Sequence, residues 1–270
     1  MEWTETLLPQ VGKRVCRLGL ATNYGVTPAD LEYAAERGIN VWVWSPTQRG
    51  GGAVSPVLKS ILAKDRDRHV VLVLGGGYFP WMVNWGLEKA RRDLGIDKVD
   101  AFLLGWLGVT SALTDSNVEA LRTARAEGKA TAVGTSIHDR PRAGRLAEDS
   151  VFDLFMLRYN AAHPGAEGEV FPHLEKRNPA IVAYTGTSWR QLLKGPTDVP
   201  WPGRDVGSVP PMTAALCYRF QLQNPHVHVA LTGPANRAQL DENLRALTDG
   251  PLLPDEEAWI RNYGRRVAGK

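Results

Sequence analysis

The sequence predicts a closed (β/α)8 TIM barrel, and three observations support this fold class. Short β-rich runs alternate with stretches of helical periodicity, which is the pattern of parallel strands joined by crossover helices. Eight such units occur in a chain of 270 residues, close to the ~250 residues typical of this barrel. The run VWVW at 41–44 is apolar at every position, as expected of a strand buried on both faces. We therefore expect a single barrel domain, residues 1–270.

The first unit shows how each element is recognised. Its strand is expected at 17–21, and Thr27 followed by Pro28 predicts a helix N-cap with proline at the first helical position. Gly38 is expected to end that helix. The other strands are expected at 41–44, 70–74, 101–104, 130–135, 152–157, 180–184 and 227–231. The later helices are expected to open at Ser55 and to span 81–94, 116–127, 140–148, 170–176, 211–222 and 237–247, with an extra helix at 255–267.

Composition narrows the classes of function. The chain has 32 basic and 29 acidic side chains and a formal net charge of +3; they are scattered, so no basic stripe indicates nucleic acid or a membrane as partner. Cys16 and Cys217 lie in apolar segments, which favours buried thiols in a reducing, cytoplasmic setting. No apolar run approaches the roughly 20 residues that span a bilayer. We expect a soluble protein that binds a small molecule; nothing in the sequence indicates an oligomeric state.

Several segments, taken together and in order, resemble the aldo-keto reductases. The opening LLPQVGKRVCRLGLAT is similar to their N-terminal hairpin and first strand, and AAERGINVWVWS to their second unit. LGIDKVDAFLLGW, GKATAVGTSIHDR and VALTGPANRAQLDENLRAL resemble their fourth, fifth and eighth units. The resemblance spans residues 7 to 247 and implies a barrel preceded by an N-terminal hairpin.

The resemblance also implies where a reductase would carry its catalytic tetrad, and all four groups are replaced. The positions of the aspartate, lysine and histidine hold Val43, Gly75 and Gly105, and the tyrosine would fall near Gln48 or Arg49. Reduction of a carbonyl leaves an alkoxide that needs a proton from an acid with a tuned pKa. Loss of these groups therefore predicts that ordinary reductase activity is absent.

The cofactor side of the resemblance is mixed. Of the residues expected to hold a nicotinamide carboxamide, Ser136 matches, whereas Ile137 and Met156 do not; Tyr184 stands where an aromatic ring stacks on the nicotinamide. The start of the eighth helix would offer free N–H groups and a positive dipole to a phosphate. Its candidate residues are Gly233, Asn236, Arg237, Gln239 and Asn243. A simple capping box explains part of this pattern equally well, so NADP(H) binding is left open.

Residues after the strands should form the mouth of the barrel, where such folds place their chemistry. The aromatic and polar candidates for substrate binding are Trp44, Gln48, Trp81, Trp106, Arg158 and Trp189. Tryptophans there would favour a flat or apolar ligand. His138 is the candidate acid or base near neutral pH, with Tyr78 as an alternative proton donor. No histidine has metal-ligand spacing with another ligand residue, so we expect no metal site.

Three functions remain consistent with the sequence. The leading hypothesis is a repurposed enzyme that acts on a flat or aromatic metabolite by non-redox acid-base chemistry through His138. The second is an NADP(H)-dependent oxidoreductase that draws its proton from another group, such as Tyr78 or His138. The third is a non-catalytic ligand-binding or regulatory protein.

Overall fold

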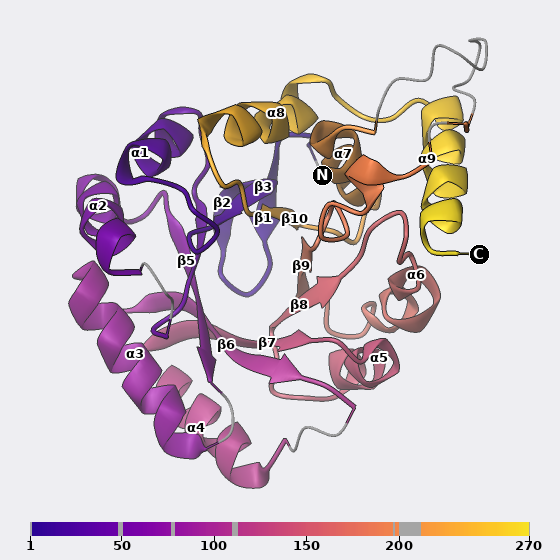
Figure 1. The fold of residues 1–270 in the computed structure, drawn as a ribbon. Helices are drawn as coiled ribbons and strands as arrows, with labels where there is room; N and C mark the ends of the chain where they lie inside the picture. Colours follow the sequence, from indigo (N-terminus) through magenta and orange to yellow (C-terminus); the bar gives the residue numbers. More distant parts are fainter. Residues whose placement is uncertain are drawn as a thin grey trace.

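The computed structural model describes residues 2–47, 51–76, 79–109, 113–196, 198–199 and 212–269. Its strands are β1 (Glu5–Leu8), β2 (Lys13–Cys16), β3 (Leu18–Ala21), β4 (Val41–Trp44), β5 (Val70–Gly76), β6 (Val99–Leu107), β7 (Ala130–Ile137), β8 (Leu154–Arg158), β9 (Ala180–Tyr184) and β10 (Val229–Thr232). β1 and β2 form an antiparallel hairpin. The other eight close into a parallel barrel in the order β10-β3-β4-β5-β6-β7-β8-β9 (Figure 1).

Helices surround this barrel in the described residues (Figure 1). They are α1 (Pro28–Glu36), α2 (Gly51–Lys64), α3 (Pro80–Leu94), α4 (Asp115–Ala126), α5 (Arg140–Glu148), α6 (Ala166–Glu169), α7 (Ala214–Gln223), α8 (Arg237–Thr248) and α9 (Pro254–Val267), with 3-10 turns at Phe171–His173 and Leu192–Lys194. The predicted (β/α)8 class, with its hairpin and its extra C-terminal helix, is confirmed.

Local signals explain where the helices begin. At α1 the Thr27 hydroxyl accepts a hydrogen bond from the Asp30 backbone N–H, and the Asp30 carboxylate accepts one from the Thr27 N–H in return. This is the reciprocal cap that the sequence indicates. The predicted helix at 170–176 is wrong: α6 is a single turn, followed by a 3-10 turn. Gly168 and Pro172 both disfavour a longer α-helix there.

Successive side chains of each barrel strand point alternately into the barrel and toward the helices. They form two apolar cores, one inside the barrel and one between the strands and the helices. Val41 and Val43 of β4 belong to the interior core, together with Met156, whereas Trp42 and Trp44 belong to the larger core between the strands and the helices. The interior core also contains hairpin residues, among them Leu8, Val11 and Val15. The hairpin therefore closes one end of the barrel interior.

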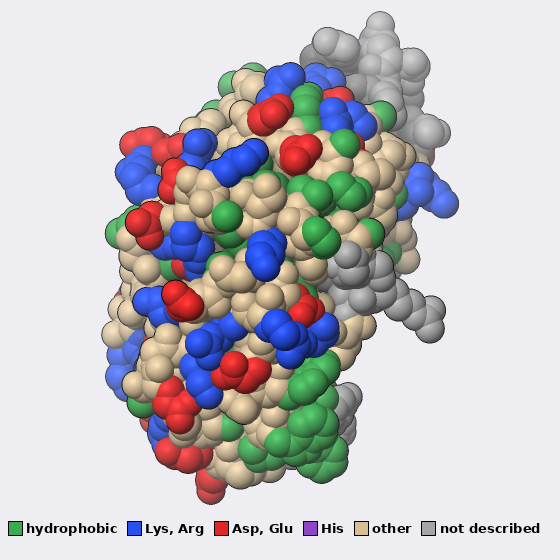
Figure 2. Space-filling model, turned by 90° about the vertical axis from the view of Figure 1, so that its left-hand side faces the viewer, with side chains coloured by type: hydrophobic (Ala, Val, Ile, Leu, Met, Phe, Trp, Pro, Cys, Tyr) green, Lys and Arg blue, Asp and Glu red, His purple; other side chains and the backbone are tan. Residues whose placement is uncertain are grey.

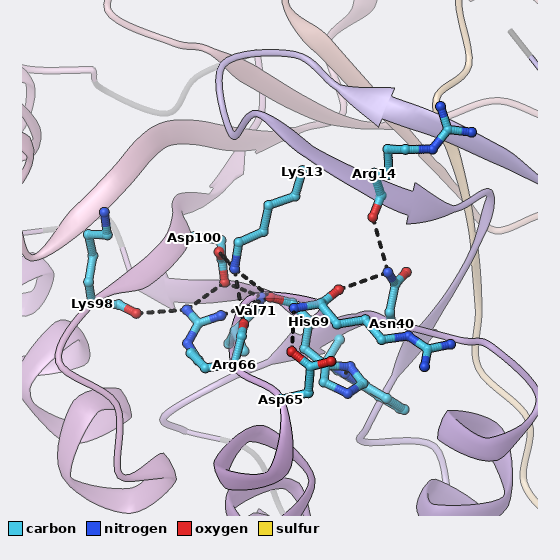
Figure 3. Close-up of polar contacts among 11 residues, drawn as sticks. Lys13, Arg14, Asn40, Asp65, Arg66, His69, Val71, Lys98 and Asp100 are labelled. Atoms are coloured by element: carbon cyan, nitrogen blue, oxygen red, sulfur yellow. Dashed lines mark hydrogen bonds and ion pairs between the residues drawn. The ribbon is translucent and has the colours of Figure 1, made fainter.

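Polar side chains tie this hairpin to the N-terminal ends of the strands (Figure 3). The Asp100 carboxylate, at the start of β6, forms ion pairs with Lys13 Nζ at 2.9 Å and with Arg66 Nη2 at 2.7 Å. It also accepts a hydrogen bond from the Val71 backbone N–H at 2.8 Å. Asn40 accepts from the Cys16 N–H and donates to two backbone carbonyls. Every member of this cluster has a partner, as a buried polar network requires.

The face formed by α1, α2 and α3 mixes acidic and basic side chains, with an apolar patch near one edge (Figure 2). Phe79, Trp81 and Trp85, at the start of α3, are exposed. Cys16 and Cys217 are buried free thiols, as predicted. Among the helices of the described residues, none combines the length and the apolar character needed to cross a membrane.

Candidate functional site

A cavity of about 410 Å³ opens beside the C-terminal ends of β9 and β10. Its walls come from the segment after β3, the segment after β9 and the β10–α8 connection, and they include Tyr24, Thr185, Trp189, Arg190, Gly233 and Gln239. β9 and β10 are the seventh and eighth barrel strands. In TIM barrels the loops after these two strands, with a helix N-terminus, frequently bind a phosphate group.

The segment after β9 has a strained backbone. Thr185, Ser188, Trp189 and Arg190 all have positive φ angles, between 50° and 67°. Each such residue costs roughly 1–2 kcal/mol because Cβ crowds the following carbonyl oxygen. Strain of this kind persists where the surrounding structure enforces it, and it clusters at functional sites. Here it carries the exposed Trp189 ring toward Tyr24, with 6.5 Å between the ring centroids.

One residue of the cavity lining, Tyr184, forms a pair with a histidine that lies outside the lining. Tyr184 ends β9 and lines the cavity, and its hydroxyl lies 3.0 Å from Nδ1 of His138, which directly follows β7. The two rings meet edge to face, with their centroids 5.8 Å apart. Alternation along β7 and β9 explains the meeting, because Ala132 and Val182 face the barrel interior and residues an even number of positions later point the same way.

The surroundings determine the protonation states of this pair. Burial raises the pKa of Tyr184 to about 12, although the nearby Ser136 hydroxyl and the positive charge of Arg158 oppose the effect. Partial burial, aided by the same Arg158 charge, lowers the pKa of His138 below its usual 6.5. Near neutral pH the phenol therefore keeps its proton and the imidazole is neutral. Tyr184 then donates its hydrogen bond to Nδ1 of His138.

Three side-chain oxygens around the inner wall of the cavity are buried without a hydrogen-bond partner in the described part of the chain. They belong to Ser136, Thr185 and Gln221. Thr185 lines the cavity, and Gln221 Oε1 would lie 2.8 Å from a Cβ placed on Gly186, which also lines it. A buried polar atom left unpaired costs about 1–3 kcal/mol. These oxygens are therefore candidates for contacts with a polar ligand.

The start of α8 places the other predicted cofactor residues. Gly233, Gln239 and Asn243 line the cavity, and Asn236 caps α8 by accepting from the Gln239 N–H at 3.0 Å. Arg237 is the exception. Its guanidinium pairs with Asp30 of α1 at 2.8 Å and lies over the Tyr33 ring. Arg237 therefore lies outside the cavity lining and is paired with α1, and its contact with a phosphate stays a prediction.

Trp44 requires a correction. It is 2% exposed, and its indole N–H donates to the Ser55 hydroxyl of α2. It therefore packs between strand and helix and cannot contact a ligand at the mouth. The physical reason is alternation: Val43 occupies the interior side of β4, so Trp44 must point outward.

The remaining mouth residues are dispersed. Trp81 is 63% exposed at the start of α3 and stacks on Phe79, outside the lining of the cavity. Trp106 is half exposed near the end of β6, and Trp189 lies on the cavity rim. Arg158 ends β8, between the strands of His138 and Tyr184. Gln48, Arg49 and Tyr78 lie outside the described residues.

Comparison with known proteins gives a consistent result at the level of structure. No protein-family model matches the sequence, and no curated protein resembles it significantly. Several solved structures, however, are similar to this chain. Aldo-keto reductase AKR11C1 from Bacillus halodurans, in its holo form, is similar with a TM-score of 0.78 and 17% identity, over 96% of each chain. An aldo-keto reductase from Klebsiella pneumoniae in complex with NADPH gives 0.77 and 21%, over 96% of this chain and 95% of that one. The glycerol dehydrogenase AKR11B4 from Gluconobacter oxydans gives 0.76 and 18%, over 100% and 98%.

This chain has the aldo-keto reductase fold. Within that fold, the interior positions near the ends of β4, β5 and β6 hold Val43, Leu74 and Gly105, none of which can ionise. Gly75, where the sequence comparison places the lysine, faces outward, since a Cβ there would meet the Phe102 ring at 2.2 Å. Ile137 and Met156 lie in the apolar cores. The ionisable groups gather instead at the ends of β7, β8 and β9.

Sequence reasoning missed several residues of this aldo-keto reductase-like site. Thr185 directly follows a predicted strand and Tyr24 comes three residues after another, so their positions alone could have drawn attention to them. Gln221 and Tyr218 lie inside α7, where no sequence signal separates them from ordinary helix residues. In the described ranges no cluster of three or more His, Cys, Asp or Glu side chains is arranged to hold a metal ion.

Proposed function

We propose that this protein is an oxidoreductase that binds a nicotinamide nucleotide in the cavity beside β9 and β10 and moves the substrate proton through Tyr184 and His138. The observation that carries the proposal is the 3.0 Å contact of the His138 imidazole with the hydroxyl of Tyr184, a residue that lines that cavity. A donor and an acceptor whose pKa values are displaced in opposite directions are typical of acid-base sites.

The residues around the cavity fit such a cofactor in three respects. The unpaired oxygens of Ser136 and Thr185 suit the polar edge of a carboxamide. Tyr24 and Trp189 offer aromatic surface to a flat ring. Arg190 lines the cavity with no ion pair or side-chain hydrogen bond among the described residues, and it can meet a phosphate. The NADPH complex of the Klebsiella structure, which shares the fold, supports the same assignment.

In this proposal the side chains of Tyr184 and His138 transfer the proton. A nicotinamide, when bound, would supply or accept a hydride at the substrate carbon. In the oxidation direction Tyr184 Oη receives the proton of the substrate hydroxyl while its own proton passes to His138 Nδ1. His138 is exposed and exchanges that proton with solvent. Reduction runs the same relay in reverse. General acid-base catalysis of this kind contributes typically 10²–10⁴-fold.

A second candidate is non-redox acid-base chemistry on a flat metabolite by the same pair. Two observations favour it: the apolar placement of Met156, and the engagement of Arg237 by Asp30, which together remove expected cofactor contacts. Isomerisation through an enol would use Tyr184 and His138 without a hydride. The two candidates differ in whether the cavity binds a nicotinamide nucleotide.

Titration with NADPH separates them. We expect quenching of tryptophan fluorescence with a micromolar Kd, since Trp189 lies on the cavity rim. Arg190→Glu should weaken binding at least tenfold, or about 1.4 kcal/mol, because it replaces the unpaired cation with an anion. Arg122→Glu, on the exposed face of α4, is the matched control and should bind as the unmodified protein does. Absence of binding at millimolar NADPH would contradict the proposal and favour the non-redox candidate.

A further inference from the structure

Arg158 is a cation without a counter-charge. It is partly buried at the end of β8, and its guanidinium forms no ion pair or hydrogen bond with any described residue. Two arginines that are more deeply buried than Arg158 are both bound: Arg17 donates to two backbone carbonyls, and Arg219 pairs with Glu256. A charge taken out of water is costly unless it is paired. Arg158 is therefore suited to an anion that the folded chain itself does not supply.

The topology places Arg158 between the two members of the proton pair. β8 lies between β7 and β9 in the barrel, and Arg158 is in register with Tyr184. Leu154 and Met156 of β8 face the barrel interior, so by alternation Arg158 also points to the interior side. Its charge acts on both His138 and Tyr184. The three side chains therefore converge on one space.

Among the described residues no acidic side chain pairs with Arg158, and the two acids on neighbouring elements have other partners. The Asp139 carboxylate accepts from the Arg142 N–H as the cap of α5. The Glu242 carboxylate, on the far side of the cavity, accepts from the Ala214 N–H at 2.7 Å. Both acids have structural roles on other elements, so within the described part of the chain a ligand is the remaining source of a counter-charge.

From this arrangement we infer that the substrate is a 2-oxo acid or the corresponding 2-hydroxy acid. Arginine binds a carboxylate in a bidentate manner, and in these compounds one C–C bond joins the carboxylate to the carbon that bears the reacting oxygen. Such a molecule needs a carboxylate-binding group next to a proton donor. Arg158 and Tyr184 are paired in register on adjacent strands and provide these two groups. In the reduction the carbonyl carbon gains a hydride from the reduced nicotinamide, which is oxidised, and the carbonyl oxygen gains the proton held by Tyr184. The inference rests on the proposed function.

The probe that tests it is phenylglyoxylate, a ketone that cannot enolise, paired with its uncharged methyl ester. Calorimetric titration without any nucleotide should show that the unmodified protein binds the acid at least tenfold more tightly than the ester. Arg158→Leu should abolish this preference, Arg158→Lys should retain part of it, and Arg122→Leu on α4 should leave it unchanged.

Each outcome decides the matter. Equal affinity for acid and ester, no binding of the acid at millimolar concentration, or full affinity in Arg158→Leu would overturn the inference. NADPH is titrated into the same variants, because its phosphates are the alternative anion. Loss of NADPH affinity in Arg158→Leu, with binding of the acid unchanged, would assign Arg158 to the cofactor and also overturn the inference. If the unmodified protein binds the acid through Arg158 but does not bind NADPH, the proposed function fails while the carboxylate site stands.

Discussion

The two ends of the barrel use the same types of residue in opposite ways. At the N-terminal ends of the strands, Asp100 is bound by Lys13, Arg66 and a backbone N–H, and the hairpin is held in place by these contacts (Figure 3). At the C-terminal ends, Arg158 has no partner among the described residues, and Ser136 buries an unpaired hydroxyl oxygen.

At the N-terminal end the buried charges are paired within the protein. At the C-terminal end polar groups remain available to a ligand. A satisfied ion cluster stabilises the folded state, because removal of one member leaves uncompensated charge. An unsatisfied cluster contributes no such stabilisation, and its groups remain available to a bound molecule. The division agrees with the general rule that TIM barrels place chemistry at the C-terminal face and stability at the other.

The largest expected effect is at the closed end. Asp100→Ala should lower the free energy of unfolding by about 3–5 kcal/mol, since it leaves Lys13 and Arg66 without their shared carboxylate. Chemical denaturation measures the change. The control Arg122→Ala, which breaks only an exposed pair with Glu119, should have no measurable effect. A loss below about 1 kcal/mol for Asp100→Ala would show that this cluster resembles a surface ion pair and would remove the contrast between the ends.

The next effect is the pH dependence of the reaction at the C-terminal ends of the strands. The pKa of His138 is lowered below 6.5, so above pH 6.5 the imidazole is mainly neutral and can accept the Tyr184 proton. This neutral population is lost as the pH falls through the lowered pKa. The rate of 2-hydroxy acid oxidation, measured with mandelate, should fall about tenfold per pH unit below that value. NMR titration of the imidazole gives the pKa directly. Arg158→Leu should raise it; a pKa above 6.5 in the unmodified protein would refute the assignment.

A smaller effect is expected at the cavity rim. Trp189→Ala should weaken NADPH binding by about fivefold to tenfold, because loss of one aromatic contact is worth roughly 1 kcal/mol. Calorimetry measures the affinity without relying on the removed fluorophore. Trp85→Ala, another exposed tryptophan but on α3, is the matched control. Equal weakening in both variants would indicate that Trp189 has no specific role.

The smallest effect completes the comparison. Arg158→Leu should change the free energy of unfolding by no more than about 0.5 kcal/mol, since no ion pair among the described residues is lost. Chemical denaturation alongside Asp100→Ala provides the check. Destabilisation of the same size in both variants would mean that Arg158 is structural, like Arg66 at the opposite end.

Much of the fold could be predicted because its signals are local. The cap at Thr27 and the runs of apolar residues at 41–44 and 70–74 specify elements through neighbours in sequence. Trp44 was placed wrongly although the same local rule, applied strictly, would have put Val43 inside and Trp44 outside. The error was one of side-chain direction, not of element.

The site depends on contacts that no local rule contains. Asp30 pairs with Arg237 across 207 residues of sequence, and Arg237, which the α8 pattern favoured for phosphate binding, lies outside the cavity lining. The contact of His138 with Tyr184, 46 residues apart, was not predicted, although both residues were expected at the ends of barrel strands. Their hydrogen bond depends on the angles between strands, which the sequence does not specify.

The most direct test of the account is single-turnover reduction of phenylglyoxylate by NADPH in the unmodified protein and in Tyr184→Phe. The variant removes only the hydroxyl that donates to His138. We predict a 10²–10⁴-fold slower reduction, with the Kd for NADPH and for the acid unchanged. Equal rates in the two proteins would contradict the claim that Tyr184 and His138 deliver the proton.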